Sequence, residues 1–144
     1  MDKQNTSITK EQHSRLVFIN YKIEKISFIQ NQQFKFEKPL DVEFSLQTEI
    51  TYSDKSAVVT INCIIFDDAV SKNLPFTLEA TISGNFTIEG ATEDEDFLKF
   101  CEINGTAVLF PYLRAAVTNI TATSNQPPLI LPLVNVNNLN KARS

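Results

Sequence analysis

The sequence predicts an α+β domain in which four strands are followed by helices that cover one face of the sheet. Apolar and polar residues alternate through most of residues 16–88, and a helical period replaces this alternation after residue 93. The chain has 144 residues, 42% of them apolar and 21% charged, which suits one hydrophobic core. We expect a flexible N-terminal tail at residues 1–14 and a single domain over residues 15–140.

The first strand is expected at residues 16–29, which are rich in Val, Ile, Phe and Tyr. Its alternation changes parity between Ile23 and Ile26, which indicates a β-bulge or a bend. A polar connection follows over residues 30–39. Phe34 and Phe36 interrupt it, although a solvated loop has no need of two aromatic rings.

Three further strands are expected. Residues 40–52 are apolar on one parity and polar or acidic on the other, so this strand should have one buried and one wet face. Residues 57–66 are apolar on both parities, which is typical of a central strand. Residues 74–88 alternate again, and Gly84 indicates a bulge or bend within them.

The helical pattern begins after the acidic run Glu93–Asp96, because carboxylates stabilise a helix N-terminus. Asn104-Gly105 is expected to break this helix, so that residues 106–123 form a second one. Pro111 should kink the second helix or occupy its first turn. Residues 126–132 are interrupted by prolines and are expected to be extended.

Charge is distributed unevenly along the chain. The formal net charge is +3 over residues 1–38, −10 over 39–102 and +3 over 103–144. No basic stripe is present, which argues against nucleic-acid binding. The longest apolar run is too short for membrane insertion, and residues 1–14 lack the apolar core of a signal peptide. We therefore expect a cytoplasmic protein with reduced thiols.

Few residues could carry chemistry. His13 is the only histidine, which excludes a histidine-pair metal site and leaves no obvious general base. Cys63 and Cys101 lie in apolar patterns and are expected to be buried thiols. Arg114 follows an apolar run and is expected to pair with a carboxylate. We expect no catalytic residue, no metal, no cofactor and therefore no enzyme.

The strands carry more apolar surface than one helical layer can cover. The helices reach one face of the sheet, while residues 58–66 are apolar on both. Another subunit, a ligand or a client polypeptide is expected to cover part of the other face. The alternative is that the C-terminal segment folds over it.

Two motifs give the sequence a family resemblance. Residues 109–114 read Leu-Phe-Pro-Tyr-Leu-Arg, and residues 127–135 read Pro-Pro-Leu-Ile-Leu-Pro-Leu-Val-Asn. They resemble the Leu-Phe-Pro-Tyr-x-Arg and Pro-x-Leu-x-Leu-x-x-Val-Asn patterns of the SecB family of export chaperones. Further matches in the first and fourth strands extend the resemblance over residues 16–139; these are Ile26-Ser27-Phe28 and the spaced Phe76, Glu79, Gly84, Phe86 and Ile88.

The resemblance implies a four-stranded antiparallel sheet backed by C-terminal helices, and a homo-oligomer built as a dimer of dimers. It also implies an ATP-independent holdase that binds unfolded polypeptides in apolar grooves. The structural motif falls on Leu109, Phe110, Pro111, Tyr112 and Arg114. The positions for client binding and oligomer contact fall on Phe76, Leu78, Ala80, Ile82, Val136 and Leu139, with Phe34 and Phe36 as the aromatic wall of the first crossover.

The sequence also departs from the family at its docking positions for the SecA motor. Two acidic positions correspond to Lys25 and Ile29, Glu79 retains a third, and Thr77 replaces a neighbouring leucine. These departures argue against export through SecA. One alternative is a SecB-like chaperone dedicated to a single client, such as an antitoxin. Another is a small domain that binds an apolar ligand in a closed pocket.

Overall fold

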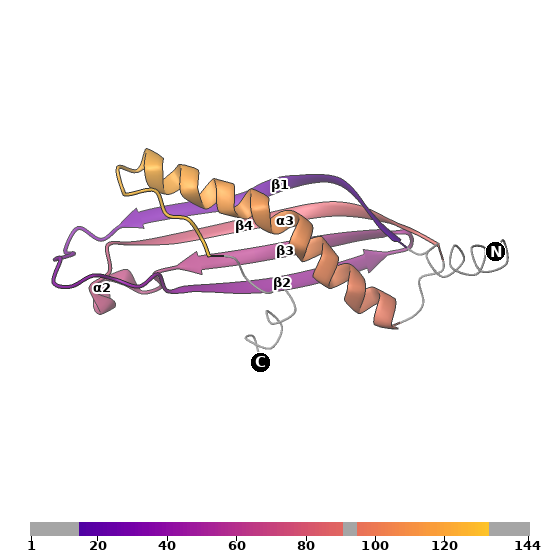
Figure 1. The fold of residues 1–144 in the computed structure, drawn as a ribbon, viewed down its shortest axis with the longest axis horizontal. Coiled ribbons are helices and arrows are strands. Elements are labelled where there is room, and N and C mark those ends of the chain that lie inside the picture. The colour runs from indigo at the N-terminus through magenta and orange to yellow at the C-terminus, as the bar shows by residue number, and fades with distance from the viewer. Residues whose placement is uncertain (1–14, 91–94, 133–144) are drawn as a thin grey trace, which may run out of the picture.

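The structure is a computed structural model that describes residues 15–90 and 95–132. Its elements, in chain order, are β1 (Arg15–Gln30), β2 (Phe44–Ser53), β3 (Ser56–Ile65), α2 (Ala69–Lys72), β4 (Phe76–Glu89) and α3 (Glu95–Thr123). The strands form one antiparallel sheet in the order β1-β4-β3-β2, and α3 lies diagonally across one face (Figure 1). The predicted fold class is confirmed, with β3 and β4 as the central strands.

Two β-bulges interrupt the pairing of β1 with β4. The register shifts between Phe18 and Asn20, and again between Ile23 and Lys25. The second shift confirms the bulge expected from the change of parity. Because residues paired across antiparallel strands share a face, the two shifts keep six apolar residues of β1 on the face that carries α3. They are Leu16, Phe18, Tyr21, Ile23, Ile26 and Phe28.

The face of the sheet that carries α3, called here the inner face, forms the core. Alternate residues of the two central strands are buried there, as are the helix residues that meet them. Burying a large aliphatic or aromatic side chain stabilises the fold by about 1.5–3 kcal/mol. The core includes Val59, Ile61, Ile65, Phe76, Leu78, Ala80, Ile82 and Phe86 from the strands and Leu109, Phe110, Leu113 and Val117 from α3.

The opposite, outer face of the sheet is mainly polar. On β4 the side chains between the buried ones belong to Thr, Ser, Asn and Glu residues. Apolar side chains on this face are scattered, as with Val58 and Ile64 on β3. The expected apolar cover of this face stays a prediction, and the described residues offer few exposed apolar side chains for it, among them Val58 and Ile29. Uncovered apolar surface also lies along β1 and α3.

The expectation of two helices separated at Asn104-Gly105 is wrong, because α3 is continuous. A Cβ atom at Gly105 would lie 2.6 Å from Cγ2 of Val59, so the glycine lets the helix approach β3 closely. Gly84 serves the same contact from the sheet side, since its Cβ would lie 2.6 Å from Cδ2 of Leu109. Of the bulge or bend expected at Gly84, no bulge is seen in the pairing of β4 with β3, which is regular, while the β1 bulge between Phe18 and Asn20 lies beside Gly84 on the other side of β4. Pro111 lies inside the helix and is exposed.

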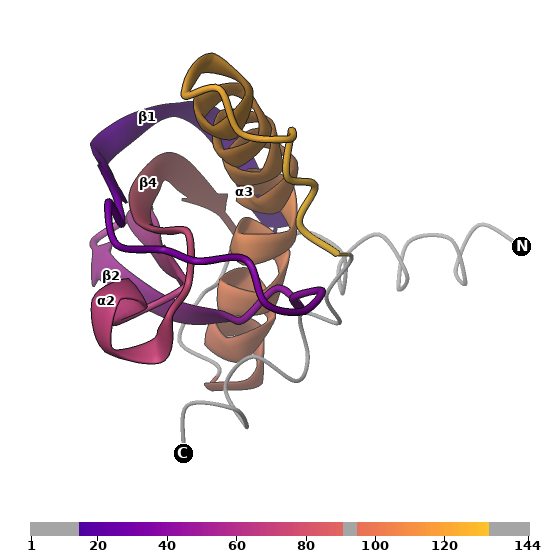
Figure 2. The same cartoon turned by 90° about the vertical axis from the view of Figure 1, so that its left-hand side faces the viewer.

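After α3 the chain reverses at Asn125, and residues 126–132 return along the helix without regular secondary structure (Figure 2). The expected carboxylate partner of Arg114 is replaced by the backbone of this returning strap. Nε of Arg114 donates to the carbonyl oxygen of Leu131 at 3.0 Å, and the hydroxyl of Thr118 donates to that of Leu129 at 2.8 Å. Leu131 is completely buried, so the strap closes part of the core.

Candidate functional site

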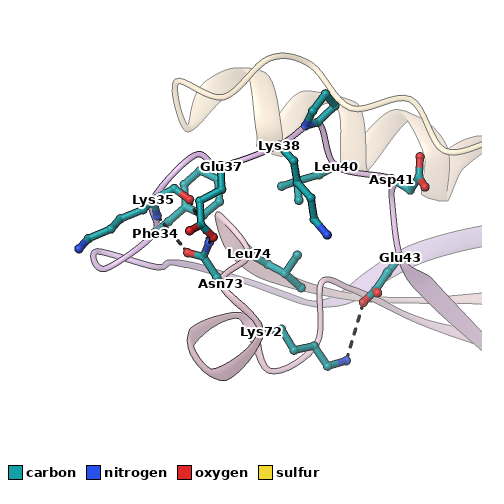
Figure 3. Close-up of a pocket in the computed structure, with 11 residues that line it drawn as sticks. Phe34, Lys35, Glu37, Lys38, Leu40, Asp41, Glu43, Lys72, Asn73 and Leu74 are labelled. Carbon is teal, nitrogen blue, oxygen red and sulfur yellow. Dashed lines mark hydrogen bonds and ion pairs between the residues drawn. The ribbon is translucent and has the colours of Figure 1, made fainter.

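The connection between β1 and β2, residues 31–43, crosses the end of the sheet near α2, and we call it the crossover segment (Figure 2). Residues 40–43 belong to this segment, although the sequence predicted them to start a strand. Between the crossover segment and α2 lies a cavity of about 620 Å³, within the usual size range of ligand pockets. This crossover groove is lined by Phe34, Lys35, Glu37, Lys38, Pro39, Leu40, Asp41, Glu43, Lys72, Asn73 and Leu74 (Figure 3).

The base of the crossover segment is fixed by Asn31, whose side chain is buried. Its Nδ2 donates to the carbonyl oxygens of Ala69 at 3.2 Å and Leu74 at 2.9 Å, and its Oδ1 accepts from the Gln33 backbone N–H at 2.9 Å. Its own backbone N–H donates to the carbonyl oxygen of Pro75 at 2.9 Å. A buried amide with all these partners holds the segment firmly to the turn before β4.

Two adjacent residues at the C-terminal end of α2 tie the crossover segment to opposite rims of the groove (Figure 3). At one rim, the amide of Asn73 hydrogen-bonds both backbone groups of Lys35 and the carboxylate of Glu37. At the other, Nζ of Lys72 lies 3.7 Å from Oε2 of Glu43. Exposed ion pairs of this kind contribute about 0–1 kcal/mol, so the second tie is the weaker one.

The two phenylalanines of the crossover segment take different positions. Phe34 is half-buried and lines the groove together with Leu40 and Leu74. Phe36 is 74% exposed and lies outside the groove lining. The groove lining therefore combines apolar residues with charged side chains. This combination suits a polypeptide that offers both apolar side chains and polar backbone groups.

Phe28, Phe66 and Phe76 form an aromatic cluster beside the groove. The ring centroids of Phe28 and Phe76 are 4.9 Å apart, and those of Phe66 and Phe76 are 5.2 Å apart. Phe66 has a φ of 55°, which is strained for a bulky side chain. Its backbone is held by the carbonyl oxygen of Glu43, which accepts its N–H at 3.0 Å, and by the hydroxyl of Thr77, which donates to its oxygen at 2.6 Å.

The β4 residues expected in an accessible groove lie inside the core. Phe76, Leu78, Ala80 and Ile82 are at most 3% exposed beneath α3, so a client cannot reach them while the helix stays in place. The alternation of β4 located an apolar face correctly, but that face is covered within the same chain. Val136 and Leu139, the other expected positions, lie outside the described residues.

Glu79 lies on the outer face of the sheet and is fully engaged by its neighbours. Its Oε1 accepts from Nζ of Lys25 at 3.0 Å, and its Oε2 accepts from Nδ2 of Asn62 at 3.0 Å. The hydrogen bond from Asn62, followed by that from Lys25, lowers the pKa of Glu79 below its ordinary value. Lys25 thus forms an ion pair with Glu79, the two residues that the family resemblance led us to expect at docking positions.

β2 forms one edge of the sheet, and a second cavity of about 340 Å³ lies near its far end. Ile50, Tyr52 and Leu98 supply the apolar part of its lining. The hydroxyl of Tyr52 donates to the Leu98 carbonyl oxygen at 2.6 Å. Burial, with smaller contributions from Cys101 and Glu102, raises the pKa of Tyr52 to about 12, so this donor persists at neutral pH. Hollows therefore flank both ends of the β2 edge.

An apolar surface is exposed where α3 passes over the edge strand β1. Tyr21 and Ile26 of the inner face are 42% and 40% exposed, and Tyr112 of α3 is 38% exposed. The rings of Tyr21 and Tyr112 stack with centroids 4.1 Å apart. Other exposed apolar members of this β1–α3 surface are Ile23 and Val108. Sequence reasoning missed it, because the bulges that gather it on one face obscure its periodicity.

Both cysteines of the chain are buried. Burial raises the pKa of the Cys63 thiol to about 12 and also raises that of Cys101, which disfavours the nucleophilic thiolate form of both. Among residues 15–90 and 95–132, histidine, cysteine and acidic side chains do not gather into a group that could hold a metal ion. Within the same ranges, no helix combines the length and apolar character needed to cross a membrane.

The sequence and the fold both match known proteins. A family model described as preprotein translocase subunit SecB matches residues 10–144. An uncharacterized protein of Methanocaldococcus jannaschii, MJ0357, is 34% identical over 124 residues, which cover 84% of this chain and 79% of that protein. A protein-export protein SecB of Legionella pneumophila is 30% identical over 123 residues, which cover 81% of this chain and 69% of that protein.

A solved structure has the same fold. The Mycobacterium tuberculosis Rv1957 SecB-like chaperone, in complex with a ChAD peptide from the Rv1956 HigA1 antitoxin, superposes with a TM-score of 0.68 and 19% identity. The match covers 83% of this chain and 91% of the mycobacterial chain. The antiparallel sheet, the strand order and the helix across one face thus form an architecture already seen in a chaperone structure.

Proposed function

The chain belongs to the SecB family, and from that premise we propose that it is an ATP-independent holdase that binds unfolded polypeptides in the crossover groove. The observation that carries this proposal is the groove itself, whose lining combines Phe34, Leu40 and Leu74 with charged side chains. Unfolded clients share exposed apolar side chains and a polar backbone, and such a groove can accept both without a specific sequence.

The edge of β2 extends the proposed site. The strand has 10 residues and therefore spans about 33 Å at about 3.3 Å per residue. As an edge strand, it presents backbone N–H and C=O groups to which an extended client could pair, while client side chains enter the hollow at either end. We infer that the preferred client segment is extended and about 10 residues long.

We also propose that the chain acts as a homo-oligomer, with a dimer of dimers as the expected form. The support is the β1–α3 surface, on which Tyr21, Ile26 and Tyr112 are exposed together. From Ile103 to Thr123 the only charged residue of α3 is Arg114, whose Nε is bound to the strap. Clustered apolar residues beside an edge strand favour association with another copy of the chain. Several copies would also present several grooves to one client and so raise its apparent affinity.

A second candidate is a chaperone dedicated to one client, such as the antitoxin of a toxin–antitoxin system. The similarity in fold to the mycobacterial chaperone, which was solved with an antitoxin peptide, favours this candidate. The pairing of Glu79 with Lys25 favours it too, since an acidic docking position for SecA is neutralised. The crossover groove does not support the alternative of a closed pocket for a small apolar ligand, because its lining includes the exposed side chains of Lys35 and Lys38.

The test is suppression of aggregation without nucleotide. An enzyme unfolded in guanidinium chloride is diluted into buffer with equimolar chaperone, and light scattering is recorded. We expect the wild type to suppress scattering and Phe34→Asp to lose much of that effect. Val70→Asp is the matched control, because Val70 lies on α2, is exposed and does not line the groove. Wild-type protein that leaves scattering unchanged would contradict the proposal.

A further inference from the structure

The side chain of Asn73 hydrogen-bonds both backbone groups of Lys35, as a neighbouring β-strand would do with its own backbone. Its Oδ1 accepts the backbone N–H of Lys35 at 3.0 Å, and its Nδ2 donates to the backbone oxygen of the same residue at 2.9 Å. Nδ2 also donates to Oε1 of Glu37 at 3.0 Å. One amide side chain thus holds both polar groups of a single residue in the crossover segment, together with the carboxylate two positions later.

The position demands this residue type for two independent reasons. The backbone of Asn73 is left-handed, with φ 53° and ψ 57°, at the C-cap of α2. Glycine and asparagine adopt this conformation most readily, because other side chains clash with the backbone there. Glycine has no amide, and aspartate could accept from Lys35 but could not donate to it. Asparagine both adopts the left-handed backbone conformation and supplies the donor and the acceptor that bind Lys35.

The other ties of the crossover segment cannot replace this one. Asn31 holds the base of the segment, and its backbone oxygen accepts the N–H of Phe34 at 3.1 Å, but it makes no contact with the rim beyond Phe34. The ion pair of Lys72 with Glu43, at 3.7 Å between exposed side chains, is long and weak. Phe34 precedes the clamped Lys35 directly, so the Asn73 contacts fix the rim of the groove at its aromatic wall.

We propose that Asn73 is the positioning residue of the crossover groove, because its clamp on Lys35 sets where the crossover segment and Phe34 lie relative to α2. This inference rests on the proposed function, since it assigns a role within client binding. Loss of the clamp leaves the segment attached at its base by Asn31 and at its far end by the backbone bond between Phe66 and Glu43, with the stretch between them untied. The segment then samples several positions, and a client that binds must order it first.

The experiment compares Asn73→Gly with wild type. Glycine keeps the left-handed backbone, so the substitution removes the amide without adding strain. Hydrogen exchange is followed on peptides covering residues 33–38, and binding is measured by anisotropy with labelled, reduced and carboxymethylated ribonuclease A as a permanently unfolded probe. We expect exchange of the segment to accelerate by about 10-fold or more and probe affinity to fall about 3- to 10-fold, with β3 and β4 still protected.

Two further variants complete the test. Asn73→Asp keeps the acceptor for Lys35 but loses both donors and places a charge beside Glu37, so it should behave like Asn73→Gly. Asn125→Gly, at a left-handed asparagine after α3, is the matched control and should change neither reading. Unchanged exchange at residues 33–38 in Asn73→Gly would overturn the clamp, and faster exchange with unaltered affinity would overturn the positioning role. Failure of the proposed function is distinguishable, because the wild type itself would then not bind the probe.

Discussion

The guanidinium of Arg114 donates from Nε to the backbone oxygen of Leu131 across 3.0 Å. This bond joins the two motifs that stand out in the sequence, residues 109–114 on α3 and residues 127–135, of which the first six are described. Besides the bond from Thr118 to the Leu129 oxygen, the hydroxyl of Thr121 adds a further link, because it accepts the backbone N–H of Leu129 at 2.9 Å. The helix therefore supplies the polar contacts that a strap without regular structure lacks, and the strap returns Leu131 to the core.

We expect Arg114→Ala to release the strap. Hydrogen bonds to charged groups contribute about 1.5–3 kcal/mol, and Leu131 would lose part of its burial as well, so the free energy of unfolding should fall by about 2–4 kcal/mol. Urea unfolding at fixed protein concentration measures the loss. Arg15→Ala is the matched control, because its exposed pair with Glu89 should contribute at most about 1 kcal/mol. Equal losses in the two variants would contradict this role for Arg114.

We expect Gly105→Ala to destabilise the protein, although alanine is normally favoured over glycine within a helix by about 1 kcal/mol. The new Cβ would lie 2.6 Å from Cγ2 of Val59, a stiff β-branched side chain, and overpacking of this kind costs about 1–3 kcal/mol. The net loss should be up to about 2 kcal/mol in chemical unfolding. In a Val59→Ala background the clash disappears, so the same substitution should become neutral or stabilising.

Glu79 should make the stability of the protein depend on pH. Its pKa is lowered in the folded chain, first by Asn62 and then by Lys25, so its ionised form stabilises the fold above the pKa of the unfolded chain. We expect the wild type to exceed Glu79→Gln in unfolding free energy by at most about 1 kcal/mol near neutral pH. This advantage should disappear as the pH falls through the folded pKa, below the ordinary 4.5.

Urea unfolding across a pH series at fixed protein concentration measures this advantage. Glu49→Gln is the control, because Glu49 lies on β2 and its substitution also removes a carboxylate from the outer face of the sheet. A difference between wild type and Glu79→Gln that persists unchanged into acid would contradict the account of Glu79.

The β1–α3 surface should hold the oligomer together. Four chains of 16.2 kDa would sediment as a species of about 65 kDa. Ile26→Asp places a charge within the apolar surface and should shift the protein towards smaller species. Val70→Asp, which adds the same charge to α2, should leave the sedimentation unchanged. A wild-type protein that sediments as a monomer at micromolar concentration would contradict the proposed assembly.

Periodicity alone predicted most of the fold. The change of parity between Ile23 and Ile26 located a bulge, and the two-sided apolar pattern of residues 57–66 located a central strand. Gly105 was misinterpreted because its low helix propensity is a local signal, whereas its actual role is a close approach to Val59 that only tertiary structure reveals. The prediction of a carboxylate partner for Arg114 was wrong for the same reason, because the sequence does not show which backbone oxygen will lie near a side chain.

The sequence indicated the fold more fully than it indicated the residues that shape the crossover groove. Alternation shows that Phe76, Leu78, Ala80 and Ile82 share an apolar face, but it cannot show whether that face is covered by the chain's own helix. Asn31 and Asn73, which fix the crossover segment, lie in turns where no period exists. Asparagine is one of the residues that commonly end a helix in the left-handed conformation, as Asn73 does at the C-cap of α2. This preference is the one sequence signal that could have drawn attention to Asn73.

The central claim is that unfolded polypeptide enters the crossover groove beside Phe34. The chain contains no tryptophan, so a Phe34→Trp variant carries a single indole at this wall. It is titrated with reduced, carboxymethylated ribonuclease A, which has no tryptophan of its own, and Val70→Trp on α2 provides the comparison. We predict a saturable change in emission from Phe34→Trp and none from Val70→Trp. Emission from Phe34→Trp that stays constant while the labelled probe binds would contradict the claim.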